Sequence, residues 1–162
     1  MFEKKFVKES QFVVVQAREE ARTLGSRTVE AEHLLLALAR RTGDPAGTAL
    51  AEAGLDHAAV TEALEAERDQ TLAAVGVSVS AFDLPPVTPA KSEPGWGTSA
   101  KLSLQRAFTA AAERGDKGIV PAHVLLGVLA AEAGTVPRAL ERAGVTPADM
   151  EQRTRLALDA TA

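Results

Sequence analysis

An internal repeat limits the fold of this 162-residue chain more than any other feature of its sequence. Shifted by 90 positions, the segment from Ala17 to Leu55 aligns with a later segment without a gap. The aligned pairs include His33 with His123, Leu35 with Leu125, Leu36 with Leu126, Leu50 with Leu140 and Gly54 with Gly144. Chance matches in an Ala-rich chain would not place a His-x-Leu-Leu string and an Ala-Leu-x-x-Ala-Gly string in one register. The chain therefore contains two copies of one structural unit.

Each copy is predicted to form four helices. In the first copy, apolar residues at helical spacing and capping signals place them at about 4–24, 31–40, 45–54 and 56–72. Asp44 is suited to cap the third helix, with Pro45 at its first position. The apolar residues are mostly Ala, Leu and Val, with five Phe, one Trp and no Tyr, which favours close helix packing over a β-sandwich. We expect an all-α fold of eight helices in two pseudo-symmetric four-helix repeats.

The two copies are expected to form one domain over residues 1–162. Repeat 1 covers about 4–75 and repeat 2 about 98–160. The linker at 76–97 is rich in Pro, Gly and Ser, which is typical of an irregular connector. Because each copy has only about 70 residues, we expect the copies to share a core across a pseudo-two-fold axis.

The bulk composition excludes several classes of function. The net charge is −4 and no basic face collects the 18 Lys and Arg, which argues against nucleic acid. The absence of Cys rules out disulfides. No segment resembles a signal peptide or has the roughly 20 apolar residues that span a membrane. We expect a cytoplasmic, monomeric protein without a membrane partner.

No arrangement of residues demands catalysis. His33 and His123 occupy equivalent places just inside helix starts, so they are either a metal or acid–base pair or residues that fix each helix start by hydrogen bonds. The second interpretation is favoured because metal sites need more ligands than one His on each helix offers. No phosphate loop, His-Glu-x-x-His string or Gly-x-Ser-x-Gly elbow occurs. We predict no catalytic residue, no metal and no cofactor.

Two further residues leave two interpretations open. Glu32 lies at a helix start, where it either compensates the helix dipole or receives a cationic group from a partner. Trp96, the only Trp, either anchors the linker to the fold or forms part of an exposed recognition pocket. Phe2 and Phe6, near the N-terminus, allow the same two interpretations: each is either anchored in the fold or part of an exposed recognition pocket.

Several strings of the first copy together resemble the Clp N-terminal domain, a double Clp repeat found in the ClpC and ClpA unfoldases. They are Gln16-Ala17-Arg18-Glu19-Glu20-Ala21-Arg22, Glu32-His33-Leu34-Leu35-Leu36-Ala37-Leu38 and Ala49-Leu50-Ala51-Glu52-Ala53-Gly54. The resemblance implies a non-catalytic domain that docks adaptor proteins, substrate proteins and peptides. In ClpC-type members the resemblance also implies a receptor for phosphoarginine. Glu32 is the residue here whose carboxylate would bind the guanidinium group. Ala122 stands at the equivalent position of the second copy, so at most one such site is expected.

Some relatives bind cyclic-peptide antibiotics through aromatic residues near the N-terminus, an aromatic residue before the second repeat and a nearby Lys. The resemblance assigns these roles to Phe2 or Phe6, to Trp96 and to Lys101, with Val14 on the adjoining helix. The linker string from Val87 to Lys91 imitates the same motif and offers an alternative register.

No ATPase module follows the second copy in this sequence, and Ala122 and the long linker depart from the family pattern. We therefore expect a stand-alone homologue that acts as a decoy or buffer for ligands of the ClpC N-domain, including cyclic-peptide antibiotics. The alternatives are an excised head domain of a ClpC-type unfoldase, a scaffold without a peptide site, and a helical enzyme using Glu32 and His33. The enzyme is disfavoured because adjacent helical residues point about 100° apart.

Overall fold

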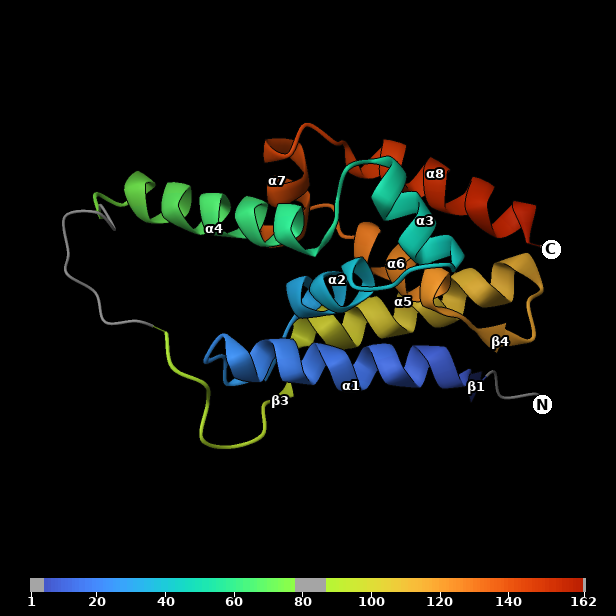
Figure 1. The fold of residues 1–162 in the computed structure, drawn as a ribbon, viewed down its shortest axis with the longest axis horizontal. Coiled ribbons are helices and arrows are strands. Elements are labelled where there is room, and N and C mark those ends of the chain that lie inside the picture. Colours follow the sequence, from blue (N-terminus) through green and yellow to red (C-terminus); the bar gives the residue numbers. More distant parts are fainter. Residues whose placement is uncertain (1–4, 78–86, 162) are drawn as a thin grey trace.

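A computed structural model describes residues 5–77 and 87–161, which form eight α-helices and four two-residue strands. The helices of the first unit are α1 Lys8–Thr23, α2 Ala31–Ala39, α3 Pro45–Glu52 and α4 His57–Ala74. Those of the second unit are α5 Thr98–Arg114, α6 Pro121–Leu129, α7 Thr135–Arg142 and α8 Pro147–Ala160. The prediction of an all-α fold with two four-helix repeats is confirmed (Figure 1).

The short strands connect the two units to each other. They are β1 Lys5–Phe6, β2 Thr28–Val29, β3 Gly95–Trp96 and β4 Gly118–Ile119. β1 pairs in parallel with β4, and β2 pairs in parallel with β3, so every strand pairs with one from the other unit. The 90-residue offset converts one pair into the other. The two strand pairs are therefore related by the pseudo-two-fold axis, and they join the units at two symmetric points.

The centre of the core is formed by α2 and α6. All nine residues of α6 are buried, and so are seven of the nine in α2. A helix that is apolar on every side is stable only where other helices surround it. In Figure 1, α1 and α5 cover one side of this central pair, while α3, α4, α7 and α8 cover the other. The contacts of α1 with α2, α5 with α6, and α2 with α6 agree with that arrangement.

The predicted capping signals are present in the structure. The Asp44 carboxylate accepts a hydrogen bond from the Gly47 amide at 2.9 Å, and Pro45 is the first residue of α3. Gly25 follows α1 with a φ of 70°, a left-handed conformation that glycine adopts without a steric penalty. These local rules therefore predict the start of α3 and the end of α1 correctly.

Two predictions about the strand regions were wrong. The first helix begins at Lys8 rather than near Lys4, because Lys5 and Phe6 pair with β4. Gly95 and Trp96, which the composition placed in an irregular connector, form β3. Two-residue strands carry no hydrophobic periodicity, so their partners in the other unit are invisible in the local sequence.

None of the helices within the described ranges combines the length and apolar character needed to cross a membrane.

Candidate functional site

An apolar groove of about 800 Å³ lies between α1 and α5, where the two units meet. It is lined by Lys5, Phe6, Gln11, Val14, Val15, Arg18, Trp96, Lys101 and Leu104. Phe6 and Trp96 come from β1 and β3 and are 90 positions apart, as are Val14 and Leu104. The groove is thus made from the same places of both copies, at the pseudo-two-fold axis.

The structure brings together four of the five residues predicted for peptide binding. Phe6, Val14, Trp96 and Lys101 all line the groove, whereas Phe2 lies outside the described residues. Trp96 is half-buried, and it packs against the core while it also lines the groove. Neither Val87 nor Lys91, the alternative register, is among the groove-lining residues in the described ranges.

The position of Trp96 is set by the backbone on both sides of it. The Gly95 amide donates to the Arg27 carbonyl at 3.0 Å, and the Gly97 amide donates to the Val29 carbonyl at 2.9 Å. The Glu30 carboxylate occupies the space where a Cβ of residue 97 would lie, so any larger residue there would have to displace that carboxylate. The groove wall around Trp96 is therefore held by the second strand pair.

Arg18 is a groove residue that the sequence analysis missed. Its guanidinium carbon lies 5.4 Å from the centre of the Trp96 ring, within the range of a cation–π interaction. Its Nη1 is 3.6 Å from the Glu93 carboxylate, and its Nε is buried without a hydrogen-bond partner in the described part of the chain. Leu104 could have been found as the repeat counterpart of Val14. Arg18 could not, because its counterpart is Phe108.

The start of α2 carries two carboxylates with different environments. Burial by itself would raise the pKa of Glu30, but hydrogen bonds from Ser99 and from Thr28, the latter 2.8 Å long, hold that pKa below its usual value. Burial raises the pKa of Glu32, and the neighbouring Glu30 charge raises it further. Glu32 is half-buried in the first turn of α2 and does not line the groove.

Both repeat histidines fix a helix start, as the favoured interpretation predicted. The Nδ1 of His33 accepts the Glu30 amide proton at 2.8 Å, and the Nδ1 of His123 accepts the Val120 amide proton at 2.9 Å. Both rings are buried. Burial lowers the pKa of His33, against the attraction of Glu30 and Glu20. The described residues contain no group of three or more His, Cys, Asp or Glu side chains suited to a metal ion.

Comparison with known proteins identifies the family. The matching family is described as the Clp repeat (R) N-terminal domain, and the match covers residues 5–89 and 97–162. The chain belongs to the Clp N-terminal domain family. Among curated proteins, no sequence matches significantly.

Solved structures similar to this Clp N-domain share its fold at low sequence identity. The N-terminal domain of the chaperone ClpD from Arabidopsis thaliana is 20% identical with a TM-score of 0.67, over 96% of this chain and 95% of that one. The Hsp104 N-terminal domain from Candida albicans is 17% identical with a TM-score of 0.60, over 93% and 89%. A protein of a malarial secretion system is 18% identical with a TM-score of 0.64, over 93% and 92%.

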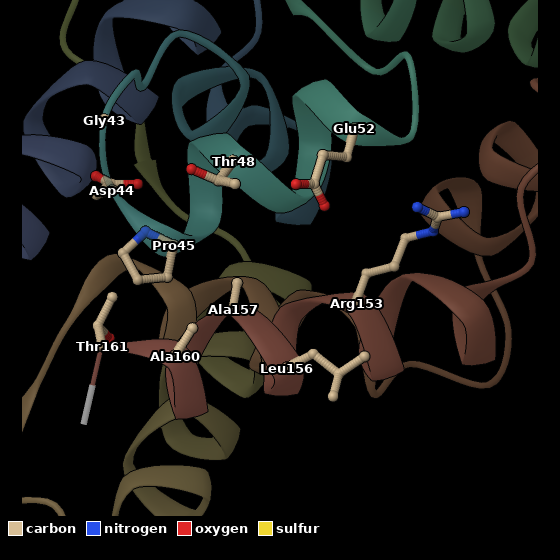
Figure 2. Close-up of a pocket in the computed structure, with 10 residues that line it drawn as sticks. All are labelled: Gly43, Asp44, Pro45, Thr48, Glu52, Arg153, Leu156, Ala157, Ala160 and Thr161. Carbon is tan, nitrogen blue, oxygen red and sulfur yellow. The ribbon is translucent and has the colours of Figure 1, made fainter.

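A second pocket, of about 440 Å³, lies between α3 and α8 of this Clp N-domain. Figure 2 shows Pro45, Thr48 and Glu52 on the α3 side facing α8, which contributes Arg153 and Ala157. None of the residues predicted for peptide or phosphoarginine binding lines it. This pocket was not expected from the sequence, because it depends on which helices of the two units face each other.

Proposed function

We propose that this Clp N-domain is a non-catalytic peptide- and protein-binding domain of the Clp protease system, which docks adaptors or substrates in the groove between α1 and α5. The observation that carries the proposal is the convergence of Phe6 and Trp96, from two symmetric strands, on one apolar groove. Aromatic side chains beside aliphatic ones and a few polar groups are the usual lining of a ligand site.

The exposure of the groove supports the same function. Val15, on the groove side of α1, leaves 66% of its surface open to solvent, and Leu104 and Trp96 are only half-buried. Apolar groups that remain exposed together in a folded protein commonly mark an interaction surface.

Photo-crosslinking distinguishes the groove from the rest of helix α1. A photoreactive benzoyl-phenylalanine is placed at Val15 or at Phe12, which is 59% exposed on the same helix but does not line the groove. The probe is reduced and carboxymethylated lactalbumin, a permanently unfolded protein. We expect crosslinks from position 15 and almost none from position 12. Equal crosslinking from both positions would contradict the proposal.

Truncation of Trp96 tests its contribution to affinity. Because a central aromatic residue commonly contributes more than 1 kcal/mol to binding, Trp96→Ala should weaken binding of the unfolded protein roughly tenfold. Phe12→Ala is the matched control and should change the affinity less than about twofold. Circular dichroism confirms that each variant is folded.

A finer part of the proposal concerns the biological role. We propose that the chain buffers ligands of ClpC-type N-domains, including cyclic-peptide antibiotics. The proximity of Phe6, Val14, Trp96 and Lys101 supports this role. Calorimetric titration of a ClpC-directed cyclic peptide should give saturable binding that Trp96→Ala weakens. An absence of binding at high micromolar concentration would refute the antibiotic role.

The alternative role is that of the receptor head of a ClpC-type unfoldase. It uses the same groove, and the N-terminal-domain relatives support it. An immunoblot of native cells separates the two roles. A band near the 16.9 kDa of this sequence supports the buffer, whereas a much larger polypeptide supports the receptor head.

Glu32 supports a separate proposal of one phosphoarginine site. The half-buried carboxylate lies in the first turn of α2, whereas the equivalent Ala122 is fully buried and has no acceptor. Titration with phosphoarginine, followed by NMR shifts of the amides around Glu32, should show one site that Glu32→Gln removes. Shifts of similar size at the start of α6 would contradict the single-site prediction.

A further inference from the structure

The groove continues past Phe6 into a second hollow of about 620 Å³ along α5. This hollow is lined by Phe6, Lys101, Leu104, Gln105, Phe108 and Thr109. Phe6, Lys101 and Leu104 also line the first hollow, so the two hollows form one surface. We call the part beside Trp96 and Arg18 the α1 half, and the part beside Phe6 and Phe108 the α5 half.

The repeat relates the two halves, and it shows where they differ. Trp96 in the α1 half corresponds to Phe6 in the α5 half, and both rings line the groove. The next corresponding pair is Arg18 and Phe108. A cation therefore ends the α1 half at the place where an aromatic ring, 42% exposed, ends the α5 half. The two ends suit different chemical groups.

The charge of the groove is opposite to that of the whole chain. The chain carries a net charge of −4, yet Lys5, Arg18 and Lys101 line the groove and no carboxylate within the described ranges does so. A positively charged surface with apolar walls attracts acidic groups and holds them more strongly than open solvent would allow.

Arg18 retains capacity for a new hydrogen bond. Its nearest carboxylate, that of Glu93, is 75% exposed and 3.6 Å away, which is longer than a charge-assisted hydrogen bond. Its Nε is buried without a partner in the described part of the chain. The Arg18 side chain as a whole is 36% exposed. A ligand carboxylate can therefore replace the distant Glu93 as the partner of the guanidinium and form a shorter, charge-assisted hydrogen bond.

We propose that the groove binds an acidic amphipathic peptide segment in one direction, with its carboxylates over Arg18 in the α1 half and its apolar side chains over Phe108 in the α5 half. This inference rests on the proposed peptide-binding function and specifies its ligand class. Lys5 and Lys101 add to the general attraction of the groove for acidic groups. Because Lys101 lines both halves, the direction of the peptide rests on Arg18 and Phe108.

Three labelled peptides test the charge preference. They share one apolar block and differ in a second block of three Glu, three Gln or three Lys residues. Fluorescence anisotropy should show the Glu peptide binding roughly tenfold more tightly than the Gln peptide, and the Lys peptide binding most weakly. The preference should shrink as salt is added, because salt screens exposed charges.

Substitution of the cationic residues in the groove shows which of them cause the preference for the Glu peptide. Arg18→Gln and Lys101→Gln should each reduce the roughly tenfold ratio between the affinities of the Glu and Gln peptides, and this ratio is the quantity compared between variants. Two variants are used because Arg18→Gln also removes the contact with the Trp96 ring. Arg68→Gln is the matched control, since Arg68 is exposed on α4 and does not line the groove.

The direction of the peptide is read from Trp96, the only Trp of the chain. A quencher attached to the Glu block should reduce Trp96 fluorescence more than the same quencher attached to the apolar block. Equal quenching from both positions would overturn the single direction.

The failure of this inference differs from the failure of the proposed function. Equal binding of all three peptides overturns the charge preference and leaves the peptide-binding groove in place. If none of the three peptides binds, the groove itself is refuted as a peptide site. Displacement of the Glu peptide by an oligothymidylate of equal charge would overturn the requirement for an apolar block, because it would show that charge alone suffices.

Discussion

The contact between α4 and α7 and the contact between α3 and α8 occupy equivalent places in the repeat but are built differently. Between α4 and α7, the Glu67 side chain is only 3% exposed and accepts hydrogen bonds from Arg138 at 2.5 Å and from Arg142 at 2.7 Å. The equivalent residues between α3 and α8 are Ala157, Thr48 and Glu52. All three line the pocket of Figure 2.

The difference shows that duplication fixed the backbone while the two contacts diverged in chemistry. Hydrogen bonds from Arg142, Arg138 and Thr71 lower the pKa of Glu67 to about 2, although burial by itself would raise it. A carboxylate bound in this way ties α4 of the first unit to α7 of the second. At α3 and α8 the corresponding residues leave a hollow instead. Within the described ranges, a cluster of ion pairs therefore joins the units between α4 and α7 but not between α3 and α8.

Removal of the buried Glu67 carboxylate should have the largest effect on stability and should separate the two contacts most clearly. Glu67→Ala leaves Arg138 and Arg142 without their shared acceptor and should lower the free energy of unfolding by about 3 kcal/mol. Glu52→Ala, at the equivalent contact, removes an exposed carboxylate and should cost less than about 0.5 kcal/mol. Urea denaturation measures both. Similar losses for the two variants would show that Glu67 does not hold the units together.

Lowering the pH should remove the contribution of Glu67 to the free energy of unfolding without any substitution. The pKa of Glu67 is about 2 in the folded chain and near 4.5 in the unfolded one, so the stabilisation is complete above about pH 4.5 and is lost as the pH falls toward 2. The loss should be on the order of 3 kcal/mol.

The comparison with Glu67→Gln isolates this contribution. Glu30 and Asp116 also have lowered pKa values, and they lose stabilisation in both proteins. The difference in unfolding free energy between the wild type and Glu67→Gln should therefore narrow as the pH falls toward 2. A difference that stays constant would contradict the assignment of the low pKa to Glu67.

The two repeat histidines extend the comparison to the helix starts. Each ring accepts one backbone proton, but only His123 has a carboxylate of Asp116 2.7 Å from its Nε2. His123→Ala should therefore lower the free energy of unfolding by about 1 kcal/mol more than His33→Ala. In an Asp116→Ala background the two substitutions should have similar costs. If the gap persists in that background, the extra cost comes from packing of the ring.

The sequence predicted much of the fold from local signals, several of which recur at the same position of both copies. Asp44 with Pro45 and the glycine after α1 fixed helix ends by rules that need only neighbouring residues. His33 and His123 could be assigned to helix starts because they recur at one position of the repeat. Local signals and a duplicated register are sufficient for an all-helical architecture.

The groove and the charged contact depend on pairings between distant residues. The resemblance to the Clp family indicated Phe6, Val14, Trp96 and Lys101, but nothing near Arg18 in the sequence marks it as a neighbour of Trp96. Glu67 likewise lies on a helix of ordinary charged residues, 71 positions before Arg138. Such contacts follow from the tertiary arrangement of the units, so the sequence pattern could not reveal them.

Filling the pocket between α3 and α8 should change the free energy of unfolding least among these substitutions. Ala157 is half-buried and lines this pocket, so Ala157→Leu places additional apolar carbons in space that is now empty. Because the pocket is partly open to solvent, we expect a gain in unfolding free energy of only about 0.5 kcal/mol. Ala148→Leu, exposed on the same helix and outside the pocket, controls for helix propensity and should change stability less. A loss of stability at position 157 would show that this contact is already closely packed. The asymmetry between the two contacts would then lie in charge alone.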